Sequence, residues 1–185
     1  MAAVRRQRQG LTIDVIRVAV FIALLLPLVS CVELRAETEV TPEILPTSLL
    51  VPSVIDLQAL GRRAKSQHLP IVLVYSASDC DHCERLEQEV LVPLLVSGDL
   101  QEVAIIVKIM IDGVDSITDF RGRQQDAEYY SIMKGVEVTP TIEFVDGDGT
   151  TLVSMIVGYQ SADMYLAYFK AAAQASRLIT AAQKN

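Results

Sequence analysis

The chain has 185 residues, about half of them apolar, which is enough for one domain with a hydrophobic core. It has no Trp, only 5% aromatic residues and a formal net charge of −7. An acidic surface repels phosphate backbones and few aromatic rings are present to stack on bases, so nucleic acid is not an expected partner.

The N-terminal segment has the pattern of an export signal. Arginines within residues 1–17 precede an apolar run over residues 18–32, whose fifteen residues fall short of a membrane-spanning helix of about 20. We predict a signal peptide or membrane anchor over residues 1–31. The run ends in Leu28-Val29-Ser30-Cys31, which resembles the lipobox of bacterial lipoproteins and makes Cys31 a candidate lipidation site. The alternative is an ordinary Cys in a signal that is uncleaved or cut elsewhere.

Residues 32–53 are rich in Glu and Pro, a composition that suits a tether between a membrane and a domain. The remaining residues, 54–185, are then the folded domain. Because the positive flank of the signal stays in the cytoplasm, we expect this domain to be periplasmic or otherwise extracytoplasmic. A lipid or an uncleaved anchor would hold it at the membrane.

The first elements of the domain surround a pair of cysteines. Residues 54–67 have apolar residues at helical spacing and predict a helix. The continuous apolar run Ile71–Tyr75 predicts a strand that is buried on both faces. After a polar turn over residues 76–79, a helix is expected to open at the cysteines and continue to about Val96, with Pro93 bending or ending it.

The later elements alternate between strands and helices. We expect a strand within 102–111, a loop over 112–123, a helix over 124–134 stopped by Gly135, strands at 141–145 and 151–157 joined by an Asp-Gly-Asp-Gly hairpin, and a last helix capped by Ser161 and running to about Ala182. This order predicts an α/β sandwich with a mixed sheet.

The three cysteines divide into one candidate lipid site and one Cys80-Asp81-His82-Cys83 unit. Two thiolates are too few for a structural zinc site, which takes four ligands, so no metal site is expected. In an oxidising compartment outside the cytoplasm such a pair can cycle between dithiol and disulfide. The pair is therefore the candidate catalytic centre.

The position of the pair predicts different roles for its members. Cys80 precedes the helix, where unpaired amides and the helix dipole favour a thiolate, so it is the expected attacking group. Cys83 lies one turn further on the same face, more deeply buried, and is the expected resolving thiol. A protonated His82 would stabilise the thiolate further, whereas Asp79 and Asp81 oppose it. The alternative for His82 is an exposed turn residue with little effect.

These residues together resemble the thioredoxin superfamily over about residues 54–182. A buried strand leads into a Cys-x-x-Cys helix, and Thr139-Pro140-Thr141 comes later, before a hairpin. The segment Glu84–Leu95 is most similar to exported single-domain thioredoxins of the sulfur-oxidation type. The resemblance implies a thioredoxin fold, a three-layer sandwich with a central mixed sheet flanked by helices. It also implies a redox-active disulfide between Cys80 and Cys83 and no other cofactor.

The resemblance also assigns substrate-binding residues. Pro140 corresponds to the family's cis-proline, which lies against the cysteine pair, and Thr139 would offer backbone hydrogen bonds to an extended substrate. The alternative is a trans proline that begins an edge strand. Gly158-Tyr159 is expected near the same face.

One departure from the family concerns proton transfer. The family buries an acid six residues before the first cysteine, where this chain has Val74. The matching Lys108 then lacks its usual partner, and Glu84, Glu87 or a water are the candidate substitutes. Other departures are Asp79 in place of a Trp and Asp81-His82 in place of Gly-Pro.

The function that these residues indicate is reduction of disulfides in exported proteins, with protein thiols and disulfides as partners and a membrane electron donor to recharge the pair. Three alternatives remain: a disulfide oxidant or isomerase, favoured by His82; a copper-binding thioredoxin-like carrier; and a redox-inert adaptor. The remaining apolar candidates, Tyr129, Tyr130, Ile132 and Met133, are expected to pack in the core.

Overall fold

The computed structural model describes residues 50–113 and 116–183. Cys31, the predicted signal segment and residues 32–49 of the predicted tether lie outside this part of the chain. The described residues form a four-stranded sheet in the order β2-β1-β5-β6, in which β1 runs parallel to β2 and antiparallel to β5, and β6 runs antiparallel to β5. The strands are β1 (Ile71–Ser76), β2 (Ile105–Met110), β5 (Thr141–Val145) and β6 (Ile156–Val157).

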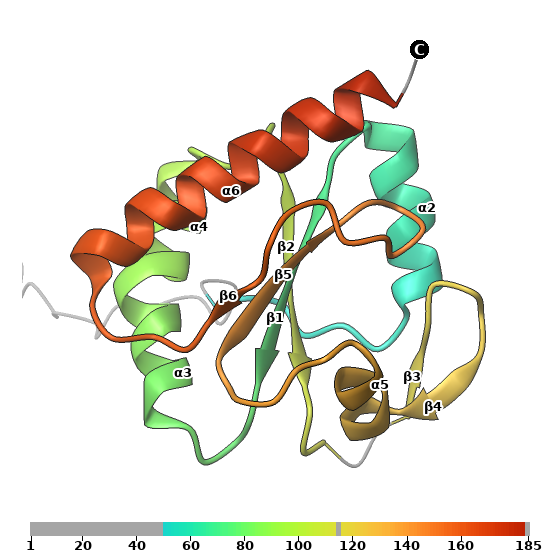
Figure 1. Cartoon of the computed structure of the whole chain (residues 1–185), viewed down its shortest axis with the longest axis horizontal. Helices are drawn as coiled ribbons and strands as arrows, with labels where there is room; N and C mark the ends of the chain where they lie inside the picture. Colours follow the sequence, from blue (N-terminus) through green and yellow to red (C-terminus); the bar gives the residue numbers. More distant parts are fainter. Residues whose placement is uncertain (1–49, 114–115, 184–185) are drawn as a thin grey trace, which may run out of the picture. The chain divides into compact units, whose positions relative to one another are not determined.

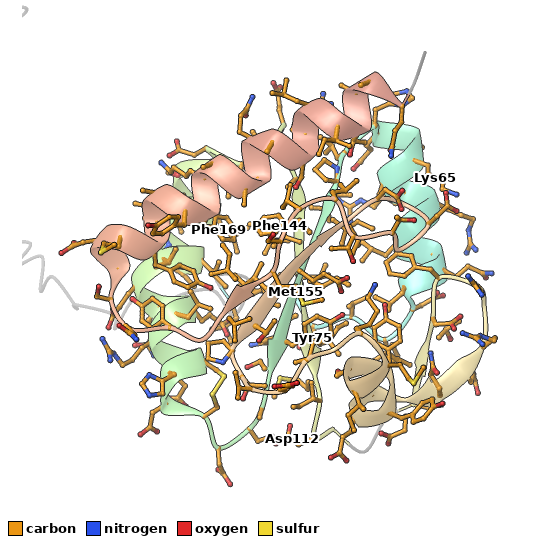
Figure 2. The ribbon with its side chains drawn as sticks, viewed as in Figure 1. Lys65, Tyr75, Asp112, Phe144, Met155 and Phe169 are labelled. Atoms are coloured by element: carbon orange, nitrogen blue, oxygen red, sulfur yellow. A yellow bond between two sulfur atoms is a disulfide. The ribbon has the colours of Figure 1, made fainter. Side chains whose placement is uncertain are left out.

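Helices cover both faces of the sheet, which confirms the expected thioredoxin fold (Figure 1). One face carries α2 (Leu57–Gln67) and α5 (Ala127–Met133); the other carries α3 (Asp81–Leu86), α4 (Val92–Ser97) and α6 (Ala162–Ala182). Each face has its own hydrophobic cluster. Under α6, the rings of Phe144 and Phe169 lie 5.7 Å apart (Figure 2).

Strand β1 is central because all six of its residues are buried and it pairs on both sides. Its β-branched and apolar side chains serve both clusters alternately. Since β1 and β2 are parallel, both end at the same edge of the sheet. The loop that carries the first cysteine comes directly after β1 at this edge, so the sheet positions the site.

The helix after the cysteines continues past Pro93, which neither ends it nor stops its packing. A π-helical turn, η3 (Glu87–Leu91), joins α3 to α4, and the N–H of Val92 bonds to the carbonyl of Glu87. Pro93 then falls in the first turn of α4, where a missing N–H is tolerated. The change of pitch therefore accommodates the proline.

The expected loop at 112–123 and helix at 124–134 require correction. Residues Ser116–Thr118 (β3) and Gln124–Asp126 (β4) form a two-stranded antiparallel sheet, and α5 begins only at Ala127. Two causes act together. Buried Asp119 accepts hydrogen bonds from Arg123 and Gln125 and so closes the hairpin, and Asp126 caps α5 by accepting from the N–H of Tyr129 at 3.0 Å.

Two other helices differ from expectation at their N-terminal ends, one in its first residue and one in its cap. Helix α2 begins at Leu57 rather than at residue 54 because Asp56 caps it, accepting from the N–H of Ala59 at 2.8 Å. Helix α6 has the expected extent, but the side chain of Ser161 makes no capping hydrogen bond.

The predicted strand over 151–157 is shorter than expected. Thr151 forms an isolated bridge with Val145, and pairing resumes only at Ile156 opposite Ile142. The register differs by two residues between these points, so the intervening chain bulges out of the ladder. Regular pairing is therefore confined to β6.

Four apolar residues of α5 were expected to pack in the core, and only one of them does. Tyr130 is buried, whereas Tyr129, Ile132 and Met133 are exposed. The helix is only two turns long and rests on the sheet through one side, so its other apolar side chains face outward.

Candidate active site

The two cysteines are joined by a disulfide at the start of α3, visible as the yellow bond in Figure 2. Cys80 is the N-cap: its Sγ accepts a hydrogen bond from the N–H of Cys83 at 3.3 Å, and its carbonyl accepts from the N–H groups of Cys83 and Glu84. Cys83 is buried and Cys80 is half-buried. The sulfur that a second molecule can reach is therefore that of Cys80.

The segment before β5 lies against this sulfur. The Thr139–Pro140 peptide bond is cis, as the resemblance implied, and Thr139 Oγ1 is 3.5 Å from Cys80 Sγ. Neither the N–H nor the C=O of Thr139 bonds to another backbone group in the described residues. The N–H of Gly158 bonds to the carbonyl of Pro140 at 2.8 Å, which places the loop after β6 at this face.

The loop between β1 and Cys80 is held from the side of β2. Ile111 donates its N–H to the carbonyl of Ser76 at 2.9 Å, and the N–H of Ser78 donates to Asp112 Oδ2 at 2.7 Å. Asp112 lies at the sheet edge where the two parallel strands end (Figure 2). The hydrogen bond from Ser78 lowers the pKa of Asp112, because it stabilises the carboxylate.

Lys108 has a partner, and it is Glu87 rather than Glu84. Lys108 Nζ lies 2.7 Å from Glu87 Oε2, and the N–H of Val51 donates to Glu87 Oε1 at 2.8 Å. Lys108 sits beside Val74 in the parallel pairing, so the acid has moved from the strand to the facing helix. Glu87 lies one turn after Cys83, and its N–H bonds to the Cys83 carbonyl.

The residues predicted to tune the thiolate flank the disulfide at the surface. Asp79, Asp81 and His82 are all exposed. Within residues 50–113 and 116–183, none of their side chains makes a hydrogen bond or ion pair. The structure thus places them beside the sulfur, while their effect on it stays a prediction.

A second support for the active-site helix was not predicted. Arg85 Nε bonds to Glu89 at 3.0 Å and stacks over the ring of Tyr159, whose hydroxyl donates to the same carboxylate. The bonds from Tyr159 and then Arg85 lower the pKa of Glu89; burial and then Glu89 raise the pKa of Tyr159 to about 12. The i, i+4 spacing of Arg85 and Glu89 is the signal that sequence reasoning could have used.

Two kinds of feature are absent from the described residues. No group of three or more His, Cys, Asp or Glu side chains is arranged there to hold a metal ion. No helix in this part of the chain combines the length and the apolar character needed to cross a membrane.

Comparison with known proteins gives one family match. Residues 57–173 match the model of a family described as a thioredoxin-like domain. No curated protein sequence matches the chain.

Among solved structures, the chain is similar to a thioredoxin h from poplar, with 16% identity over 61% of this chain and 85% of that one and a TM-score of 0.44. A thioredoxin-fold protein from Helicobacter pylori is 21% identical over 56% of this chain and 68% of that one, with a TM-score of 0.46. Fasciola hepatica thioredoxin is 15% identical over 65% of this chain and 98% of that one, with a TM-score of 0.44.

Proposed function

The chain belongs to the family of thioredoxin-like domains, and from that premise we propose that it is a protein thiol–disulfide oxidoreductase working as a reductase. The observation that carries the proposal is the Cys80–Cys83 disulfide, with its outer sulfur beside Thr139. The free backbone groups of Thr139 suit an extended substrate, which would add to this edge as a strand does.

The reaction begins with the reduced pair. The Cys80 thiolate attacks one sulfur of a substrate disulfide, a bond forms between these two sulfurs, and the substrate's other sulfur leaves as a thiolate that takes up a proton. Cys83, as a thiolate, then attacks Cys80 Sγ and releases the substrate's first sulfur. Two electrons pass to the substrate, which ends as a dithiol, and the cysteine pair ends as the disulfide. An external dithiol donor must return the electrons.

The surroundings support these two roles. Cys80 Sγ accepts a hydrogen bond from the N–H of Cys83 at the start of a helix, an arrangement that favours a thiolate. Cys83 is buried and must lose its proton before it attacks. We propose Glu87, which is one turn away and held by Lys108, as the group that accepts this proton.

The setting is also a proposal. The basic and apolar N-terminal segment supports export, and Cys31 supports a lipid anchor. We propose that the domain works outside the cytoplasm, tethered to the membrane, on disulfides of exported proteins, within the sulfur-oxidation branch of exported thioredoxins. A membrane dithiol would be its electron donor.

Trapping the intermediate tests the function. In a Cys31→Ser background, Cys83→Ala should accumulate mixed disulfides through Cys80, identified by mass spectrometry after non-reducing electrophoresis. In the same background, Cys80→Ser should lose reduction of insulin disulfides entirely, while Cys31→Ser alone keeps it. Full turnover by the Cys80→Ser variant would contradict the proposal, and no turnover by the parent Cys31→Ser protein would favour a redox-inert adaptor.

His82 favours a second candidate, a disulfide oxidant or isomerase, because it is exposed between the cysteines. Equilibration with glutathione decides between the two directions. A reductase is expected near the potential of thioredoxin, about −270 mV, whereas a strong oxidant lies near about −120 mV.

A further inference from the structure

A groove runs along the outside of α5 next to the active site. Its volume is about 510 Å³, and its lining includes Ile111, Val136, Val138 and Ile132. Ile132 and Val138 are 61% and 50% exposed. Apolar side chains gathered at a hollow of the surface mark a binding site more often than scattered ones do.

One covalent neighbour and one hydrogen bond connect the groove to the segments around the reactive sulfur. Val138 directly precedes Thr139, whose hydroxyl is 3.5 Å from Cys80 Sγ. On the other wall, the N–H of Ile111 bonds to Ser76 at the start of the cysteine loop. A chain that pairs with Thr139 therefore has the groove beside it.

The charged residues of the groove lining are both acidic. Glu128 and Glu137 line it, and neither has a cation within 4.0 Å among the residues that the structure describes. Towards the disulfide, acids continue with Asp112, Asp79 and Asp81, all exposed. These charges would attract a basic segment and repel an acidic one.

We propose that the groove selects disulfide-bearing proteins whose segment next to the reacting cysteine carries an apolar residue flanked by Lys or Arg. In an extended segment on Thr139, every second side chain points to the same side, so an apolar one can enter the groove while Lys or Arg two residues away meets the acids of its lining. A second copy of this chain, with its net charge of −7, is disfavoured by the same acids. The inference rests on the proposed function.

Three model peptides test the charge preference. They share one disulfide and one apolar residue and differ only in flanking Lys, Gln or Glu; single-turnover oxidation of the reduced full-length protein is followed by stopped flow. The Lys peptide should react about tenfold faster than the Glu peptide at low salt, and the difference should shrink at 1 M salt, where charges are screened within about 3 Å.

Variants assign the preference to the groove. Glu128→Gln with Glu137→Gln should reduce the ratio of Lys to Glu rates to about threefold or less. The matched control, Glu102→Gln, changes an exposed acid before β2, at the opposite end of the strand, and should keep the full ratio. Ile132→Ser should slow all three peptides without changing their ratio.

Hydroxyethyl disulfide, which is small and neutral, separates this inference from the proposed function. All variants should reduce it at the wild-type rate. Failure of the wild-type protein to react with it would overturn the proposed function and the inference together. Normal reaction with it, but equal peptide rates or a ratio that survives the double variant, would overturn the inference alone. A dimer in sedimentation that Ile132→Ser dissociates would overturn it as well.

Discussion

Two Lys–Glu pairs lie on opposite faces of the same sheet and have different surroundings. On the α3 side, Lys108 and Glu87 are 2.7 Å apart; on the α5 side, Lys134 and Glu143 are also 2.7 Å apart. The Glu143 side chain is fully buried, whereas that of Glu87 is 12% exposed. Distance alone does not distinguish the pairs, but their neighbours do.

Glu143 is enclosed by groups that only hold it in place. Tyr75 and Thr151 donate to its two oxygens at 2.7 and 2.6 Å, and Lys134 completes the set. Glu87 accepts from Lys108 on one oxygen and from the backbone N–H of Val51 on the other, and it lies one turn from Cys83. Each oxygen of both acids has a donor, but only Glu87 lies on the active-site helix, and this difference in position supports its proposed role in proton transfer.

The largest expected effect is a loss of stability at the Lys134–Glu143 pair. Lys134→Met leaves Glu143 charged and buried without its cation, and we expect a loss of about 3–5 kcal/mol in the free energy of unfolding, measured by urea titration. Disulfide exchange by the folded fraction should be unchanged.

The matched control is Lys65→Met, which breaks the ion pair of Lys65 with Asp148, both more than half exposed (Lys65 is labelled in Figure 2). We expect it to cost about 1 kcal/mol or less. Equal costs for the two variants would remove the distinction between buried and exposed pairs.

Alkaline pH should also lower the free energy of unfolding, because of the two buried tyrosines near Glu143. Burial, and then the charge of Glu143, raises the pKa of both Tyr75 and Tyr130 above the ordinary value of 10.0. The unfolded chain then releases these protons first, so the stability is complete below pH about 10 and is lost as the pH rises from there towards the folded pKa values. Each tyrosine should lower the free energy of unfolding by about 1.4 kcal/mol per pH unit.

Urea titrations between pH 9 and 11.5 measure this slope. Tyr75→Phe removes one titrating group and should make the slope shallower by the share of one tyrosine. A slope unchanged by this variant would show that other groups cause the alkaline loss.

The smallest expected effect concerns the pair next to the thiol. Glu87→Gln keeps the shape but removes the proton acceptor, so attack of Cys83 on a mixed disulfide at Cys80 should slow about tenfold near pH 7. Stopped-flow release of a chromogenic thiolate from Cys80 measures this step. The defect should shrink as the pH rises, because hydroxide then deprotonates the thiol.

Glu84→Gln is the control for this variant, since Glu84 is exposed on the same helix. It should leave the resolving step unchanged. If both variants slow the resolving step equally, Glu87 acts through its negative charge alone and not as a specific proton acceptor.

Local patterns in the sequence were sufficient for much of the fold and for the pairing of Cys80 with Cys83. The run Ile71–Tyr75 is apolar enough to indicate a central strand, and the cysteine spacing and the Thr-Pro-Thr segment are contiguous motifs. The partner of Lys108 could only be narrowed to Glu84, Glu87 or a water, because the choice depends on the phase of a helix against a distant strand.

Two features of the fold, the buried Glu143 and the β3–β4 hairpin, have only weak signals in the sequence. Glu143 stands within an otherwise apolar strand, and such an isolated acid indicates a buried partner. The β3–β4 hairpin could not be distinguished from the start of a helix because Gln and Asp suit both. Its formation depends on Asp119, which collects bonds from residues on the far side of the turn.

The π-helical turn at Glu87–Leu91 gives the active-site helix two independent halves. A wide turn holds one residue more than an α-helical turn, so it breaks the rotational phase between the α-helical residues on its two sides. Orientation of the thiols and of Glu87 is therefore set at the sheet edge, while Leu94 in α4 aligns with the core. Because the wide turn accommodates this extra residue, deleting one residue within it should restore a uniform α-helix and keep the buried side of α4 against the core.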